Sequence, residues 1–184
     1  VRTISGQYYF GGRYFAERLD SPSELSRVFA DPPRTTEQLV HVETPASEPA
    51  APLSVDVSGS ETWREGRRRS GGELLVRTWL TTALPDDRVE TAATGWGNDS
   101  LLPFRGPDRT TGAAWVLRWD SPADADEFAS AVADLVASLE SRNVTTLRSV
   151  RASEETVVVF AGPASFVANA TASGTNESVT VTAP

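Results

Sequence analysis

The chain has 184 residues, a net charge of −8 and no cysteine. This length suits one globular domain, or one domain with a small appendage, that folds without a metal or a disulfide. The acidic balance argues against nucleic acid as a partner, the absent cysteines exclude thiolate chemistry, and the single histidine excludes a two-histidine zinc motif in this chain.

The first 43 residues predict a helical N-terminal segment, with two helices over residues 6–30. The second of these helices begins at a capping box that opens with Ser21 and has Pro22 at its first helical position. The two prolines after Asp31 end it, because the residue before a proline disfavours helical geometry.

Residues 44–59 are expected to be a linker that carries one short strand, and residues 60–163 are expected to form the main domain. The expected helices begin near residues 73, 85 and 122, and the expected strands cover residues 101–105, 113–119, 144–150 and 156–160. The last of these helices follows a capping box that opens with Ser121, and it carries an apolar stripe that includes Phe128, Val132 and Leu135. This order predicts an α+β fold, in which an antiparallel sheet of about four strands has helices on one face. No stretch is apolar for long enough to form a membrane span.

Residues 164–184 are expected to be a tail, because Ala, Ser, Thr, Asn and Val dominate there. Four asparagines of the chain match the N-glycosylation sequon and are candidate glycosylation sites: Asn98, Asn143, Asn169 and Asn176. Two of the four fall in the tail, which fits a surface-exposed segment.

Few residues are candidates for chemistry. His41 is the one conventional general base near neutral pH, but no nucleophile motif lies beside it, so a structural role is favoured. Glu37 and Glu43 near it indicate at most a weak, chance cation site. The carboxylates at Asp86 and Asp124 are better explained by helix starts, where the dipole favours negative charge. No catalytic, metal or cofactor-binding residue is therefore expected in this chain.

Two other features allow two interpretations each. The basic run around Arg67 is either a solvated loop or a site that docks an anion or a glycan. The motif Gly95-Trp96-Gly97 combines a large aromatic with two flexible residues. We expect Trp96 to be a structural anchor in the core, next to Phe104 and to the tryptophans of one strand, rather than a ligand platform.

The composition points to an environment. All 17 basic residues are arginine, and the chain contains neither lysine nor methionine, so Val1 is not expected to be a translation start. Acidic chains without lysine resemble proteins of extremely halophilic archaea. Such a composition is tolerated there because molar salt shortens the Debye length to about 3 Å and screens the repulsion between carboxylates. A GC-rich genome would explain the missing lysine but not the acidity.

Several segments resemble a family of secreted or surface zincin-like proteins of haloarchaea and some bacteria. The similar segments are residues 8–15, 31–41, 72–80, 92–99 and 115–128, with the run Trp-Asp-Ser-Pro-Ala-Asp-Ala-Asp-Glu-Phe ending at Phe128. Full-length members carry an upstream His-Glu-x-x-His helix, which this chain lacks. The resemblance implies that the chain is the C-terminal half of such a metallopeptidase-related protein, and that any zinc chemistry belongs to the missing N-terminal half.

Three functions follow from these observations. The first is a noncatalytic domain of a halophilic archaeal secreted or cell-surface protein, with a structural or interaction role and with surface proteins, glycans or its own missing half as partners. The second is the C-terminal lobe of a zinc metallopeptidase whose metal motif lies outside this chain. The third is an intracellular halophilic binding module.

Overall fold

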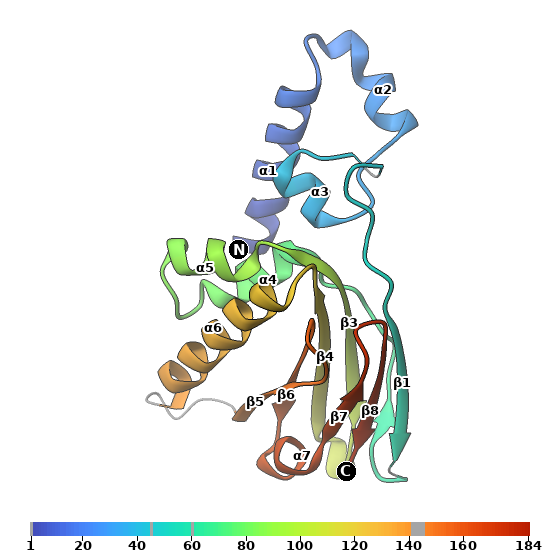
Figure 1. The fold of residues 1–184 in the computed structure, drawn as a ribbon, viewed down its shortest axis with the longest axis vertical. Helices are drawn as coiled ribbons and strands as arrows, with labels where there is room; N and C mark the ends of the chain where they lie inside the picture. The colour runs from blue at the N-terminus through green and yellow to red at the C-terminus, as the bar shows by residue number, and fades with distance from the viewer. Residues whose placement is uncertain (1, 45, 60, 141–145) are drawn as a thin grey trace.

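A computed structural model describes residues 2–44, 46–59, 61–140 and 146–184. Its helices and strands form a layered α+β body, above which the N-terminal helices stand as a separate group (Figure 1). The predicted fold class is confirmed. Among the described residues, no helix has the length and apolar character that crossing a bilayer requires.

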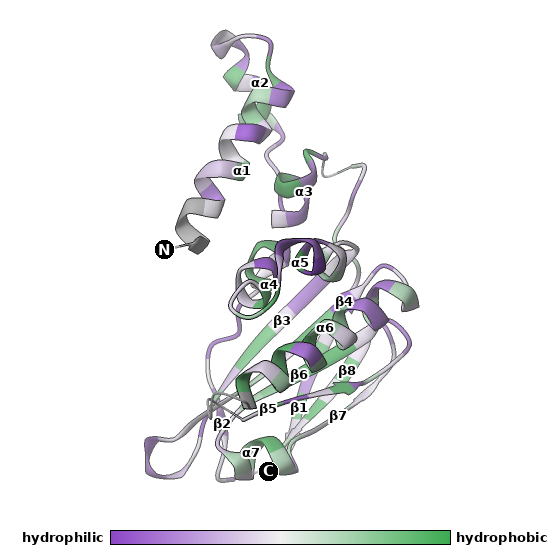
Figure 2. Cartoon of the chain, turned by 90° about the vertical axis from the view of Figure 1, so that its left-hand side faces the viewer, coloured by the Kyte–Doolittle hydropathy of each residue, from purple (hydrophilic) through white to green (hydrophobic). Residues whose placement is uncertain are grey.

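The N-terminal group contains α1 (Arg2–Arg18), a 3-10 turn (Pro22–Glu24), α2 (Leu25–Ala30) and α3 (Thr36–His41). The predicted helical character of this segment and the cap at Ser21 are confirmed. A second capping box starts α3, where the Thr35 hydroxyl accepts a hydrogen bond from the Gln38 backbone and the Gln38 side chain accepts from the Thr35 backbone. Figure 2 shows that the described part of α1 is mostly hydrophilic or neutral, whereas hydrophobic stretches occur in strands below it, most clearly in β6.

An antiparallel sheet of five strands, in the order β2-β3-β4-β6-β5, forms the centre of the body. Its strands are β2 (Arg64–Glu65), β3 (Trp96–Arg105), β4 (Thr111–Trp119), β5 (Thr146–Arg151) and β6 (Thr156–Gly162). Both predicted hairpins are present. The added strand is β2, which lies in the basic run for which no strand was expected. The strand β3 begins at Trp96, before its expected start.

Three helices cover one face of this sheet: α4 (Gly72–Leu80), α5 (Asp86–Ala93) and α6 (Pro122–Glu140). The stripe predicted on α6 is buried, with Phe128, Val132 and Leu135 fully inaccessible to solvent. The ring of Phe128 lies 4.7 Å from that of Trp119, measured between centroids. This face therefore holds one of the two aromatic groups of the core; the other, around Phe166, lies on the opposite face.

A second sheet covers the other face, and it corrects the expected boundaries. Its order is β1-β8-β7, with β1 (Ser54–Gly59) parallel to β8 (Ser178–Ala183), and with β7 (Thr171–Gly174) antiparallel to β8. Together with α7 (Ala164–Asn169) it packs on the central sheet, as Figure 1 shows on the side away from α6. Residues 164–184 are thus part of the folded body and not a tail. The strand expected within residues 44–59 pairs directly with this C-terminal segment.

The buried side chains of the C-terminal segment explain this correction. Phe166, Val179 and Val181 are inaccessible to solvent, and the burial of β8 alternates between exposed Ser or Thr and buried Val. Alternation with a period of two is the signature of a strand with one buried face. The low complexity of the composition concealed this pattern.

Candidate functional site

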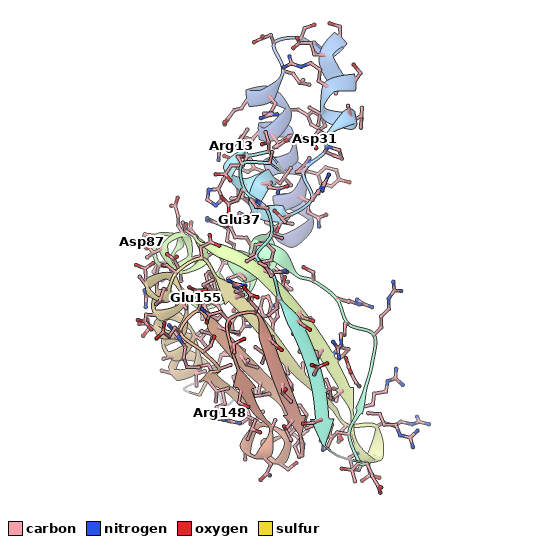
Figure 3. The ribbon with its side chains drawn as sticks, turned by 45° about the vertical axis from the view of Figure 1, so that its right-hand side comes forward. Arg13, Asp31, Glu37, Asp87, Arg148 and Glu155 are labelled. Atoms are coloured by element: carbon pink, nitrogen blue, oxygen red, sulfur yellow. The ribbon has the colours of Figure 1, made fainter. Side chains whose placement is uncertain are left out.

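Six arginines gather at one edge of the central sheet, along β2 and at the turn between β3 and β4. We call this set the arginine edge: Arg64, Arg67, Arg68, Arg69, Arg105 and Arg109, all of which are exposed. Nitrogen-tipped side chains extend into solvent from this side of the molecule in Figure 3. The chain as a whole is acidic, so this is a local reversal of its charge.

Backbone pairing places these arginines side by side. Arg64 lies opposite Arg105 in the antiparallel ladder, and Arg69 exchanges two backbone hydrogen bonds with Leu101, with N–O distances of 3.1 and 2.7 Å. The turn that carries Arg109 is tight, since Arg109 has a φ of 61° in the left-handed region. Like charges directly opposite one another destabilise a sheet, so this arrangement costs stability.

Most of this positive charge is uncompensated. Arg68 pairs with Glu65 and donates to the carbonyl of Val55. Within the described part of the chain, the guanidinium groups of the other five members make no ion pair and no hydrogen bond. Several arginines elsewhere form ion pairs, as Arg88 does with Asp134 at 3.2 Å. Free, parallel N–H donors suit carboxylate, sulfate or phosphate oxygens. The arginine edge can therefore bind an anionic group.

His41 lies at a second position of interest, a pocket of about 670 Å³ between the N-terminal helices and α4 and α5. Its Nε2 atom is 3.1 Å from Oε1 of Glu73, which is fully buried and also accepts from Nη2 of Arg77 at 2.7 Å. The hydrogen bond to Glu73 raises the pKa of His41. This network joins α3 to α4.

Trp96 is buried in the core, as expected for a structural anchor. Its side chain is 2% exposed, and it shares the helix-covered core with Trp115 and Trp119. Gly95 has a φ of 77°, and a Cβ atom there would lie 2.5 Å from Cγ of Asp124. The predicted contact with Phe104 is wrong, because Phe104 belongs to the opposite core. A register shift between Trp96 and Asn98 explains this, since a bulge turns the following residues to the other face.

The four sequon asparagines differ in access. Asn98 is half-buried and its amide donates to the carbonyl of Ala51 at 2.7 Å. Asn176 is also half-buried, and its side-chain oxygen accepts from the Ser153 hydroxyl and from the Glu155 backbone. Asn169 is exposed at the end of α7. Asn143 lies outside the described residues.

The acidic residues are grouped differently from the expectation. Glu37 does not join His41 and Glu43; its carboxylate instead lies with those of Glu48 and Asp120, with oxygen atoms from all three within 4.8 Å of one another. Burial, followed by the charge of Asp120, raises the pKa of Glu37 to about 9. Burial, followed by the charge of Glu48, raises the pKa of Asp120 to about 6. Sequence reasoning missed this trio because its members are far apart along the chain.

The carboxylates expected at helix starts lie in the first turns of α5 and α6, where the helix dipole favours negative charge. Asp86 and Asp87 are in the first turn of α5. The Asp124 backbone donates to the Ser121 hydroxyl at 3.3 Å, and that hydroxyl donates to the Asp124 carboxylate at 2.6 Å. These contacts account for the carboxylates as caps and favourable dipole partners.

Comparison with known proteins places this layered α+β body in a family. Residues 61–183 match the family described as "Domain of unknown function (DUF8575)", and the chain belongs to that family. The match includes the central sheet, its helices, the arginine edge and the C-terminal strands. No curated protein and no solved structure matches the chain.

Proposed function

We propose that this chain is a noncatalytic interaction domain of a halophilic secreted or cell-surface protein, and that its arginine edge binds an anionic partner. The observation that carries the proposal is the set of five exposed arginines that have no counter-charge among the described residues, in a chain whose net charge is −8. The partner is a surface glycan or a surface protein that presents carboxylate or sulfate groups.

The choice of arginine suits binding in concentrated salt. At molar salt the Debye length is about 3 Å, so charge attraction acts only between groups in contact. Arginine keeps an advantage under these conditions, because its planar fork donates two parallel hydrogen bonds to one anion. The sheet edge itself is short, at two residues in β2, and charged, which discourages pairing with another strand. Binding is therefore expected through side chains.

Two further observations support a halophilic surface origin. The chain uses arginine and no lysine while remaining acidic. It also resembles the C-terminal half of zincin-like surface proteins, in residues 8–15, 31–41 and later segments. In that arrangement the N-terminal half of the same protein is an additional neighbour, and any peptidase activity belongs to it.

A triple variant tests the arginine edge. Arg64→Gln, Arg67→Gln and Arg105→Gln together remove three unpaired charges, and binding to a polyuronate such as alginate is measured in about 1 M KCl. We expect the affinity to fall at least about tenfold, since a hydrogen bond to a charged group contributes about 1.5–3 kcal/mol. Unfolding curves establish that the variant stays folded.

The matched control is Arg18→Gln with Arg27→Gln, which removes exposed arginines from the N-terminal helices. This control is expected to bind alginate as the wild type does, and uncharged dextran is expected to bind neither protein. Equal loss of binding in control and triple variant would show a general charge effect and would contradict the proposal.

A further inference from the structure

We propose that Glu37, Glu48 and Asp120 form a calcium-binding site at the junction between the N-terminal helices and the body. The three residues come from separate segments: α3, the loop before β1, and the position that follows β4. Figure 3 shows Glu37 where the N-terminal group meets the upper end of the sheets. This proposal is independent of the arginine edge.

The spacing of the carboxylates fits one calcium ion. Their oxygen atoms lie within 4.8 Å of one another. Calcium binds oxygen at about 2.3–2.6 Å, so two ligands of one ion are at most about 5 Å apart. Magnesium demands near-ideal octahedral geometry and keeps several of its waters, usually with only one or two protein carboxylates, so three carboxylates from separate segments suit calcium better. A hard cation with a flexible coordination shell is the best match.

The burial of Glu37 is a second and independent indication of a ligand. Its side chain is 4% exposed, and it makes no ion pair or hydrogen bond within the described residues. A carboxylate buried in this way retains its charge only beside a counter-charge. In agreement with this, burial raises the pKa of Glu37 to about 9 when no cation is bound, so the carboxyl then keeps its proton at neutral pH.

The surrounding contacts hold the carboxylates in place. The Gln38 amide donates to the carbonyl of Glu48 at 2.6 Å, and the Asp120 backbone donates to the carbonyl of Gly95 at 2.9 Å. Gly97 leaves room for the carboxylate, because a Cβ atom there would lie 2.8 Å from Oδ1 of Asp120.

The neighbouring arginine, Arg118, donates its hydrogen bonds to groups outside the trio. Arg118 lowers the pKa of Asp120, but its hydrogen bonds go to the carbonyl of Pro52 and to the carboxylate of Glu155. The trio is therefore undercompensated in the described structure. A bound calcium ion would supply the counter-charge and would fasten α3 and the loop before β1 to the end of β4.

Calorimetric titration of the chelator-treated protein with calcium chloride tests the site, with thermal unfolding as a second readout. We expect one calcium ion to bind and the melting temperature to rise with calcium concentration, because the ion binds only the folded state. Glu37→Gln is expected to weaken calcium binding at least about tenfold. In metal-free buffer at neutral pH the same variant is expected to melt near the wild-type temperature, because a pKa of about 9 leaves the Glu37 carboxyl uncharged there and the amide has a similar size.

Glu127→Gln is the matched control, since Glu127 is exposed on α6 and is not among the charges that shift the pKa of Glu37 or of Asp120. It is expected to bind calcium like the wild type. If Glu37→Gln does not fold, Asp120→Asn replaces it, because Asp120 is the most solvent-accessible member of the trio.

Two results would overturn the proposal. One is a wild type that gives no binding heat and no thermal shift with calcium, in which case the carboxylates share a proton. The other is an equal calcium response in the wild type and in the trio variants, which would place the ion elsewhere. Neither result bears on alginate binding, so this failure is distinguishable from that of the arginine edge.

Discussion

At the scale of single residues, burial has opposite effects on the stability contributed by the Trp96 indole and by the Glu37 carboxylate. Trp96 is buried among other aromatic rings, although its Nε1 atom has no hydrogen-bond partner among the described residues. Glu37 is buried beside two other carboxylates. The indole gains free energy by leaving water, whereas the carboxylate costs free energy until a proton or a cation compensates it.

Trp96→Ala is expected to destabilise the protein by about 3–5 kcal/mol, because it leaves a large cavity in the helix-covered core. Trp96→Phe is expected to cost less, since it keeps an aromatic ring and removes the unpartnered N–H. Denaturant-induced unfolding measures both values. Tyr9→Ala is the control, because Tyr9 is 68% exposed. A loss below about 1 kcal/mol in Trp96→Ala would refute the role of anchor.

At the scale of elements, regular periodicity was predictable and irregular pairing was not. The capping box at Ser121 and the apolar stripe at Phe128 predicted α6, and both are observed. The strand β2 was missed because it has two residues, both charged, and only its pairing with β3 makes it a strand. The bulge after Trp96 was also missed, because no local signal marks an inserted residue in a ladder.

The hydrogen bond between His41 of α3 and Glu73 of α4 makes a pH-dependent contribution to the free energy of unfolding. His41 is faced by Glu73 and Arg77 of α4 and by Glu43, and the hydrogen bond to Glu73 raises its pKa in the folded state. A raised histidine pKa stabilises the fold fully below the ordinary value of about 6.5, and this contribution is lost as the pH rises through the folded-state value.

We therefore compare the free energy of unfolding of the wild type and of His41→Gln at about pH 5.5 and pH 8.5. The wild type is expected to exceed the variant by about 1 kcal/mol or less at the lower pH, because the His41 side chain is partly exposed, and by less at the higher pH. Taking the difference between the two proteins cancels the other titrating carboxyls. A difference that grows with pH would contradict this assignment.

At the scale of the whole molecule, the central sheet lies between a helical layer and a second sheet. The second sheet joins segments that are far apart in the sequence, since Val55 of β1 pairs in register with Val179 of β8. Residues before and after the expected main domain thus complete its core. Truncation at either expected boundary would expose that core.

Salt is expected to raise the stability of the whole molecule. The chain carries 25 carboxylates against 17 arginines, so self-repulsion is large in dilute buffer. Thermal unfolding between about 0.1 M and 3 M KCl is expected to show a rising melting temperature, since the Debye length falls from about 10 Å towards 3 Å or less. A melting temperature that does not change over this range would argue against a halophilic origin.

The sequence by itself determined the α+β class, the main helices and both hairpins of this protein, because these depend on local periodicity and capping. The tertiary structure alone decided that residues 164–184 complete a second sheet and that Arg64 faces Arg105. It also decided that Glu37 meets Glu48 and Asp120 rather than His41. These arrangements are set by long-range pairing and burial, and no local pattern in the chain encodes which distant residues come into contact.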